Sequence, residues 1–257
     1  MASNVARDTK LSFKVLTANV HKGFGFLNRR FILNELREAV RQVGADVVFL
    51  QEVLGSHAIH AARLVNWPAT AQYEFLADSI WPNVVYGRNA VYPEGDHGNA
   101  LLSKFPISRH DNHDFSVDGD ERRGVLHTVL ATPVFIPEIH TFCVHFGLTE
   151  AHRRTQLNML CELVEKSVPD DAPLLVAGDF NDWRLQAHTV LTERLRLKEV
   201  FALARGAAAK TFPARFPLLR LDRIYVRNAD AHAPVLLPRK PWAHLSDHAP
   251  LVAEIHL

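Results

Sequence analysis

Apolar and polar residues are grouped in blocks along the chain, and the apolar blocks predict the strands of the fold. Residues 174–177 (Leu-Leu-Val-Ala) show no alternation, which is typical of a strand buried on both faces. Residues 251–257 alternate, which predicts a half-buried last strand. Further runs of aliphatic and β-branched residues predict strands at 12–20, 46–52, 98–103, 124–131, 138–146 and 221–226.

Segments with helical spacing separate several of these runs. Residues 29–43 carry apolar side chains three or four positions apart, and Gly44 is a reasonable stop signal. A second long helix is expected at 149–167, with Thr149 as its N-cap. Shorter helices are expected at 56–65, 72–81 and 187–195. Because no repeat or flexible linker divides the sequence, we expect one mixed α/β domain at 11–257 after a flexible tail at 1–10.

Composition adds the class of protein. Apolar residues make up 47% and charged residues 22% of the chain, as in ordinary soluble proteins. The net charge of +1 gives no field over the whole molecule, so anion binding must come from a local cluster. Neither a membrane-spanning run nor a secretory signal is recognisable, and Cys143 and Cys161 fit a reducing compartment. We therefore expect a cytoplasmic monomer with no obligate protein partner.

Polar residues at or beside the ends of the predicted strands are the candidate chemistry. They offer oxygen ligands and imidazoles without a cysteine cluster, a set that suits Mg²⁺ or Mn²⁺ better than a structural zinc ion. Taken singly, each is interpreted as a turn former or a surface histidine, whereas their shared placement favours a site. The residues are Asn19, Glu52, His145, Asp179, Asn181, Asp222, Asp247 and His248.

The order of these motifs resembles that of the endonuclease/exonuclease/phosphatase superfamily, which includes DNase I-like nucleases, abasic-site endonucleases, neutral sphingomyelinases and inositol-polyphosphate 5-phosphatases. The resemblance extends from Asn19 to His248 and is nearest to a bacterial stand-alone subgroup. It implies a four-layer α/β/β/α sandwich of two mostly antiparallel sheets flanked by helices. The motifs are residues 17–21 (Thr-Ala-Asn-Val-His), 51–52 (Gln-Glu), 144–146 (Val-His-Phe), 178–181 (Gly-Asp-Phe-Asn), 221–222 (Leu-Asp) and 246–248 (Ser-Asp-His).

The resemblance also implies a role for each metal-side residue. Glu52 is similar to the principal metal ligand, and Asn19 and Asp247 are expected close to the same ion. Asp179 resembles the residue that orients or deprotonates the attacking water, and Asn181 resembles a phosphate or metal contact.

The same resemblance assigns two histidines to the phosphate. His248 is expected to donate a hydrogen bond to the scissile phosphate, with Asp222 holding its imidazole in the correct tautomer. His145 matches a second histidine across the phosphate. The carboxylate that partners this second histidine in DNase I-like nucleases has no clear equivalent, and Asn99 is the nearest position.

Weaker candidates accompany these residues. Arg123 is a candidate phosphate clamp because a guanidinium group matches phosphate oxygens, and His21 and Lys22 offer a second contact. For each of the three, simple surface solvation is an equal alternative. His57 and His60 have the spacing of a metal pair, but a solvated helix face is the favoured interpretation. Residues 118–121 (Asp-Gly-Asp-Glu) are expected to form a hairpin turn rather than a calcium loop.

The sequence therefore predicts a phosphodiesterase that depends on Mg²⁺ or Mn²⁺ and cleaves its substrate by in-line attack of activated water. The substrate is a phosphodiester in nucleic acid or a phospholipid headgroup. Apolar loops at 24–27, 212–216 and 241–242 could meet lipid or pack inward. One alternative is a catalytically silent binding module of the same fold.

A calcineurin-like dinuclear phosphoesterase is the other alternative, because residues 178–182 also satisfy a Gly-Asp-x-x-Asp pattern. It is disfavoured, since residues 19–21 read Asn-Val-His where that family needs Asp-x-His, and its later Gly-Asn-His is absent.

Overall fold

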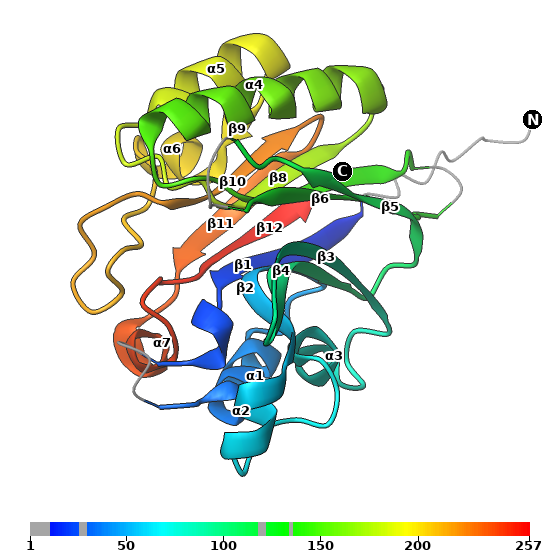
Figure 1. Ribbon diagram of the computed structural model, residues 1–257. Coiled ribbons are helices and arrows are strands. Elements are labelled where there is room, and N and C mark those ends of the chain that lie inside the picture. Colours follow the sequence, from blue (N-terminus) through cyan, green and yellow to red (C-terminus); the bar gives the residue numbers. More distant parts are fainter. Residues whose placement is uncertain (1–10, 26–29, 118–121, 134–135) are drawn as a thin grey trace, which may run out of the picture.

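Two six-stranded sheets pack face to face, with helices on the outside of each (Figure 1). The computed structural model describes residues 11–25, 30–117, 122–133 and 136–257. The tail expected at 1–10 and the turn expected at 118–121 lie outside the described residues. The predicted α/β fold class, a four-layer sandwich of two mostly antiparallel sheets, is confirmed.

The first sheet has the strand order β11-β12-β1-β2-β4-β3, and the second has the order β5-β6-β7-β8-β10-β9. Each contains one parallel pair, β1 with β2 and β7 with β8, and a helix lies between the two strands of each pair in the sequence. The strands are β1 (Ser12–Asn19), β2 (Val47–His57), β3 (Asn83–Tyr92), β4 (Gly95–Ser103), β5 (Ile107–Asp114), β6 (Gly124–Leu130), β7 (Ile139–His145), β8 (Leu174–Asp179), β9 (Lys198–Glu199), β10 (Asp222–Arg227), β11 (Asp230–Leu236) and β12 (Leu251–His256).

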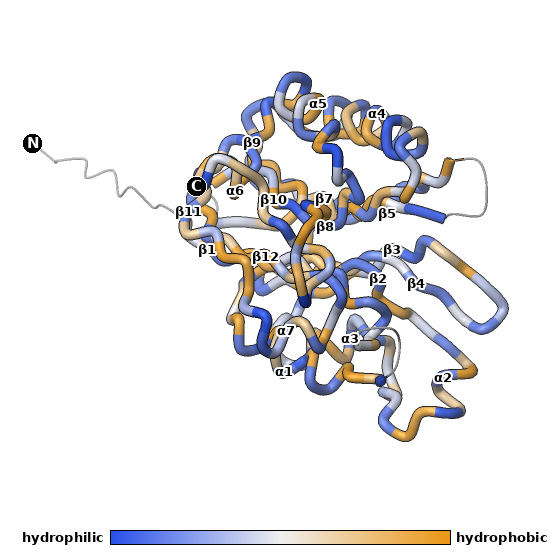
Figure 2. Tube along the Cα trace, turned by 90° about the vertical axis from the view of Figure 1, so that its left-hand side faces the viewer, coloured by the Kyte–Doolittle hydropathy of each residue, from blue (hydrophilic) through white to orange (hydrophobic). Residues whose placement is uncertain are grey.

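The helices form the two outer layers. In Figures 1 and 2, α4 and α5 lie on one side of the paired sheets, and α1, α3 and α7 lie on the other. A short α2 follows β2, and a 3₁₀ helix, η1, follows β1. The bounds are η1 (His21–Gly23), α1 (Leu33–Val43), α2 (Ala58–Arg63), α3 (Gln72–Ala77), α4 (Glu150–Ser167), α5 (Gln186–Leu195), α6 (Val200–Arg205) and α7 (Arg239–Leu245).

Apolar side chains fill the three spaces between the four layers. Phe49 and Leu175 belong to the cluster that joins the inner faces of the sheets. Leu36 of α1 packs on the outer face of the first sheet, and Leu160 of α4 packs on that of the second. Strands such as β8 are buried on both faces, which explains their unbroken apolar sequence.

Strand register brings the ends of several strands together at one edge of the sandwich. Asn19 pairs with Gln51 in the first sheet. In the second sheet, Asp179 pairs with His145 on one side and with Asp222 on the other. The polar residues predicted at strand ends are therefore gathered by the topology itself.

Several elements were not predicted, for physical reasons. All side chains of β5 are exposed or half-buried, so its sequence (Ile-Ser-Arg-His-Asp-Asn-His-Asp) has no apolar run. The helix α7 contains Pro241 and a non-helical residue, Lys240, which hide its pattern. The predicted helix at 56–65 begins later, because β2 continues to His57. The strands β3 and β11 and the helix α6 were also not predicted.

Within the described part of the chain, no helix is both long enough and apolar enough to cross a bilayer. Of the apolar loops, Trp242 packs inward, whereas Phe216 is 69% exposed. Residues 26–27 of the first loop lie outside the described residues.

Candidate active site

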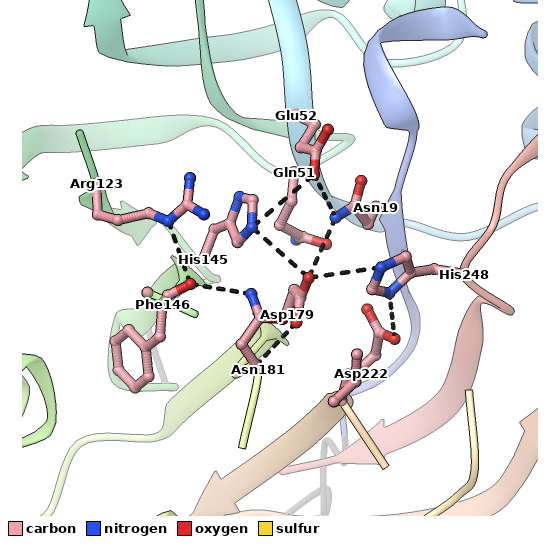
Figure 3. A network of polar contacts seen from close by, with 12 residues as sticks. Asn19, Gln51, Glu52, Arg123, His145, Phe146, Asp179, Asn181, Asp222 and His248 are labelled. Carbon is pink, nitrogen blue, oxygen red and sulfur yellow. Dashed lines mark hydrogen bonds and ion pairs between the residues drawn. The ribbon is translucent and has the colours of Figure 1, made fainter. Parts of the chain in front are cut away.

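Asp179, the last residue of β8, lies at the centre of a group of polar side chains from both sheets (Figure 3). The preceding Gly178 has a φ of 143°, and a Cβ there would lie 2.1 Å from the carbonyl oxygen of Val144. Only glycine permits this close approach of β8 to β7. The motif glycine therefore places Asp179 beside His145, its partner in the strand register.

The two carboxylate oxygens of Asp179 have different neighbours. Oδ1 accepts a hydrogen bond from the backbone N–H of Asn181 at 2.9 Å. Oδ2 accepts one from Nδ2 of Asn19 at 3.2 Å and lies 3.6 Å from Nε2 of His145 and 3.7 Å from Nε2 of His248. Burial raises the pKa of Asp179 to about 6, although His248 opposes the shift. The carboxylate is thus a base whose pKa lies near neutrality.

His248 is paired with Asp222. Its Nδ1 lies 2.8 Å from Oδ2 of Asp222, and both side chains are buried. Burial lowers the pKa of His248, but the carboxylates of Asp222 and Asp179 outweigh it and raise the pKa to about 10. The Ser246 hydroxyl holds the loop in place, because it donates to the carbonyl of Asn19 and accepts from the N–H of His248. His248 is therefore a fixed cation at neutral pH.

Glu52 reaches the site through a β-bulge. The register of β2 shifts between Leu50 and Val53, and Glu52 has a φ of 55°. The Gln51 side chain instead turns into the buried region between the sheets, where it contacts Thr17 and Cys143. A non-glycine residue in this left-handed region costs about 1–3 kcal/mol, a strain that is common at functional sites.

The environment of Glu52 keeps it ionised. Burial raises its pKa, but a protonated His145, the charge of Lys22 and the hydrogen bond from Asn19 outweigh burial and lower the pKa to about 2, the acidic range in which the His145 ring carries its proton. Its Oε1 lies 4.0 Å from Nε2 of His145. For His145 itself, burial and the nearby Arg123 hold the pKa well below the ordinary value. This histidine is therefore neutral.

Asn19 joins the two carboxylates through its amide nitrogen. Nδ2 lies 3.2 Å from both Oε1 of Glu52 and Oδ2 of Asp179, whereas Oδ1 accepts the backbone N–H of His21 at 3.0 Å. The Asn19 oxygen, the atom that would bind a metal ion, thus has a backbone partner here. Its assignment as a metal ligand stays a prediction.

Asp247 and His21 lie beside this group, with 3.7 Å between Oδ1 of Asp247 and Nδ1 of His21. Asn181 and Arg123 share one anchor, the carbonyl oxygen of Phe146, at 3.0 Å from Nδ2 and 3.2 Å from Nε (Figure 3). The structure therefore brings Arg123 to the site, as its expected role requires.

Asn99 is placed differently from the other candidates. It is fully buried, and its Nδ2 donates to the carbonyls of Gly124 and Cys143. It ties β4 to the second sheet. Its neighbour His97 was not predicted as a site residue. Burial, Lys22 and Arg123 lower the pKa of His97 to about 4, although Glu52 opposes the shift. The sequence signal that could have pointed to His97 is its position two residues before the candidate Asn99, in the same strand.

Two groups could hold a cation. Glu52, Asp247 and Asn19 carry oxygen atoms of the kind that Mg²⁺ and Mn²⁺ prefer, so by its chemistry this donor set fits such an ion, with the Asn19 oxygen bound here to the N–H of His21. Asp179, Asp222 and His248 also present ligand atoms within 4.8 Å of one another. In that trio, however, both ring nitrogens of His248 already face carboxylates. It is better suited to proton transfer.

Asp182, the last residue of the motif at 178–182, has a different partner set. Its Oδ1 and Oδ2 accept the N–H groups of Gln186 and Ala187 at the start of α5. Oδ2 also pairs with Nη1 of the fully buried Arg223 at 3.1 Å. Asp182 thus caps a helix and neutralises a buried cation, which are structural tasks.

Comparison with known proteins identifies the family. Residues 16–248 match the model of the endonuclease/exonuclease/phosphatase family. The chain belongs to this family. The protein called "Uncharacterized protein YbhP" of Escherichia coli K12 is 60% identical over 248 residues, which cover 96% of this chain and 98% of that protein. The resemblance read from the motifs is confirmed, and the calcineurin-like alternative is not supported.

Solved structures share the fold at low sequence identity. An endonuclease/exonuclease/phosphatase from Beutenbergia cavernae superimposes with a TM-score of 0.76 at 19% identity, covering 96% of this chain and 72% of that one. A humanised TDP2 from D. rerio gives a TM-score of 0.73 at 17% identity, covering 95% and 98%. These likenesses show the fold. Members of the family are generally hydrolases of phosphoester bonds.

Proposed function

We propose that the protein is a divalent-metal-dependent phosphodiesterase. The observation that carries the proposal is the position of Asp179, a buried carboxylate whose Oδ2 lies 3.6 Å from Nε2 of His145 and 3.7 Å from Nε2 of His248. In-line hydrolysis needs a base for the attacking water and a cation for the phosphate, held in a fixed relative position. Asp179 and His248 offer these two groups at 3.7 Å from each other, and the hydrogen bond from Asn19 fixes Asp179.

Asp179 is the proposed base. Its pKa of about 6 is high enough to accept a proton from water and low enough to leave the carboxylate ionised at pH 7. The hydrogen bonds from Asn19 and Asn181 fix the direction of the two oxygens. They therefore orient the carboxylate toward one attack geometry.

His248 is the proposed phosphate donor. As a cation it donates from Nε2 to a nonbridging oxygen, where negative charge grows during attack. Asp222 binds Nδ1 and so fixes the orientation and charge of the ring. Arg123 supplies a second positive charge from the side of Phe146.

His145 is neutral and lies between Glu52 and Asp179. It can donate one hydrogen bond from Nε2, either to one of these two carboxylates or to a phosphate oxygen. Glu52, with Asp247 and Asn19, would hold Mg²⁺ or Mn²⁺. When bound, such an ion stabilises charge on the phosphate and on the leaving oxygen.

The assignment to a cytoplasmic monomer is part of the same proposal. Both cysteines, Cys143 and Cys161, are buried free thiols, in keeping with a reducing compartment.

Metal removal tests the function. The full chain is assayed on bis(p-nitrophenyl) phosphate with Mg²⁺ or Mn²⁺, then in excess EDTA, then after the metal ion is restored. We expect hydrolysis that EDTA abolishes and restored metal recovers. Undiminished hydrolysis in EDTA would refute metal dependence. Absence of hydrolysis under every condition, and on nucleic acid and phospholipid substrates as well, would favour the silent binding module.

A further inference from the structure

A cavity of about 410 Å³ is formed where the chain continues past Asn19 and past Glu52. It is lined by Lys22, Phe24, Leu54, His57, His60 and Tyr92. Lys22 lies in the short helix that follows Asn19, and Leu54 follows the bulge that carries Glu52. The volume is in the range of sites that bind small organic groups.

Aromatic rings form most of the wall. The rings of His57 and His60 stack, with centroids 3.7 Å apart and an angle of 27° between their planes. His57 is held in place because its Nδ1 accepts the backbone N–H of His60 at 3.3 Å. The ring centroid of Phe24 lies 5.0 Å from that of His60, and the ring centroid of Tyr92 lies 5.9 Å from that of His57. The two histidines, expected on a solvated helix face, are thus packed into the wall of the cavity.

The row of rings continues toward the catalytic residues. The ring centroids of Tyr92 and His97 are 5.9 Å apart. His97 pairs with Leu54 in the register of β2 and β4, two residues past Glu52. A group bound among these rings would therefore adjoin a phosphate held at the catalytic centre.

The charges of the wall indicate what kind of group fits. Lys22 is the one fully charged side chain among the six lining residues. Burial, His57 and Arg63 lower the pKa of His60, so its ring is uncharged at neutral pH. None of the six lining residues is a carboxylate, so a quaternary ammonium headgroup would meet the positive charge of Lys22 and no negative charge in the wall. A flat, uncharged ring attached to a phosphate would meet aromatic side chains in the wall and an ammonium group beside them.

We propose that this cavity binds a nucleobase of the substrate, next to the phosphodiester that is cleaved. The inference rests on the proposed function and narrows its substrate to nucleic acid. The base must leave its stack to enter the cavity, so single strands and frayed ends are the preferred substrates. The net charge of +1 agrees with this choice, because recognition by stacking needs fewer phosphate contacts than a duplex groove.

A binding experiment tests the pocket apart from catalysis. The affinities of the full-length protein for AMP and for ribose 5-phosphate, which lacks the base, are measured by calorimetry with Mg²⁺ present. We expect AMP to bind about 5- to 150-fold more tightly, the range for one stacked base. Tyr92→Ala and His60→Ala should reduce this ratio toward one, whereas Tyr92→Phe keeps the ring and the ratio.

His232→Ala is the matched control, because His232 on β11 also packs against another histidine ring, with its ring centroid 4.4 Å from that of His256 on β12. It should leave the ratio unchanged. Equal affinities for AMP and ribose 5-phosphate in the wild type would overturn the proposal. The proposal would also be overturned if Tyr92→Ala and His60→Ala, shown to be folded by thermal unfolding, both kept the wild-type ratio of AMP affinity to ribose 5-phosphate affinity.

Hydrolysis of oligonucleotides separates the pocket from the proposed function. Single-stranded DNA with one abasic nucleotide, placed at each position in turn, should lose about 5- to 150-fold in kcat/KM at one position beside the cut. Hydrolysis at every position with equal efficiency would contradict the pocket but leave the phosphodiesterase intact. Base-dependent AMP binding without any hydrolysis would support the pocket and contradict the function. Cleavage of anionic phospholipid vesicles, with no preference for AMP, would overturn the choice of nucleic acid.

Discussion

The two histidines at the candidate active site lie at almost the same distance from Asp179, yet His145 is neutral and His248 is a cation at neutral pH. Nε2 of His145 is 3.6 Å and Nε2 of His248 is 3.7 Å from the same carboxylate oxygen. His248 has a second carboxylate, Asp222, at 2.8 Å, whereas the nearest second carboxylate of His145, Glu52, is 4.0 Å away. Burial lowers the pKa of both rings, and Arg123 lowers the pKa of His145 further. Because the two distances to Asp179 are nearly equal, the difference in charge comes from the other charged groups around each ring.

This asymmetry gives the two halves of the site different tasks. In the proposed mechanism, the His248 half, built on the second sheet and the loop before β12, would supply positive charge to a phosphate. The His145 half adjoins Glu52, the proposed metal ligand on the first sheet. Asp179 joins the halves, and its substitution should have the largest effect.

Asp179→Asn keeps the size of the side chain and removes the base. We expect kcat to fall by about 10²- to 10⁴-fold, the usual contribution of a general base. The free energy of unfolding should change by less than about 1 kcal/mol, because burial already disfavours the charge of this carboxylate. Steady-state kinetics and urea unfolding measure the two effects.

Asp182→Asn is the matched control within the same motif. It leaves the fully buried Arg223 without its carboxylate, so stability should fall by about 3–5 kcal/mol. At a temperature where the variant is folded, kcat should stay within about tenfold of wild type. A large loss of stability in Asp179→Asn, or a large loss of kcat in folded Asp182→Asn, would reverse the roles assigned to the two aspartates.

Asp222→Asn should make the His248 half resemble the His145 half. Without Asp222, burial dominates and the pKa of His248 falls from about 10. The wild-type rate should fall below pH 6, as Asp179 is protonated, and again near pH 10, as His248 loses its proton. In the variant, the alkaline fall should move to lower pH, and kcat at pH 7 should drop by about 10²- to 10³-fold. An unchanged alkaline limb would show that His248 is not the group that titrates.

Arg123→Met tests the other half with a smaller effect. We expect KM for a phosphodiester to rise about tenfold with less change in kcat, because a phosphate clamp acts in the ground state and transition state alike. Arg122→Met, the neighbouring exposed arginine, should leave KM unchanged and serves as the control. Equal effects of the two variants would mean that Arg123 acts only through overall charge.

The sequence predicted the strands that carry the site, because strands buried on both faces have unbroken apolar runs. It could not predict β5, whose exposed side chains bury no apolar surface, or the bulge at Glu52, which depends on pairing with β4. The motif residues were placed in order, but the orientation of the Asn19 amide depends on the backbone of His21. The task of Asp182 required knowledge of Arg223, which lies on a distant strand.

The aromatic cavity shows the same limit. His57 and His60 have helical spacing in the sequence, and that spacing alone favours a solvated face. The stacking of His57 on His60, and the packing of Phe24 against His60, depend on how the end of β2 meets η1. Contacts between segments distant in sequence carry this information, and local patterns do not.

The most direct test of a neutral His145 beside a cationic His248 is an NMR titration of the histidine rings in the metal-free protein. Protein labelled with ¹⁵N-histidine is followed from pH 5 to pH 10, and signals are assigned with His145→Gln and His248→Gln. The predicted result is a His248 ring that stays doubly protonated past pH 8 and a His145 ring that is neutral at pH 6. Two rings that titrate together near pH 6.5, or a charged His145 beside a neutral His248, would contradict the account.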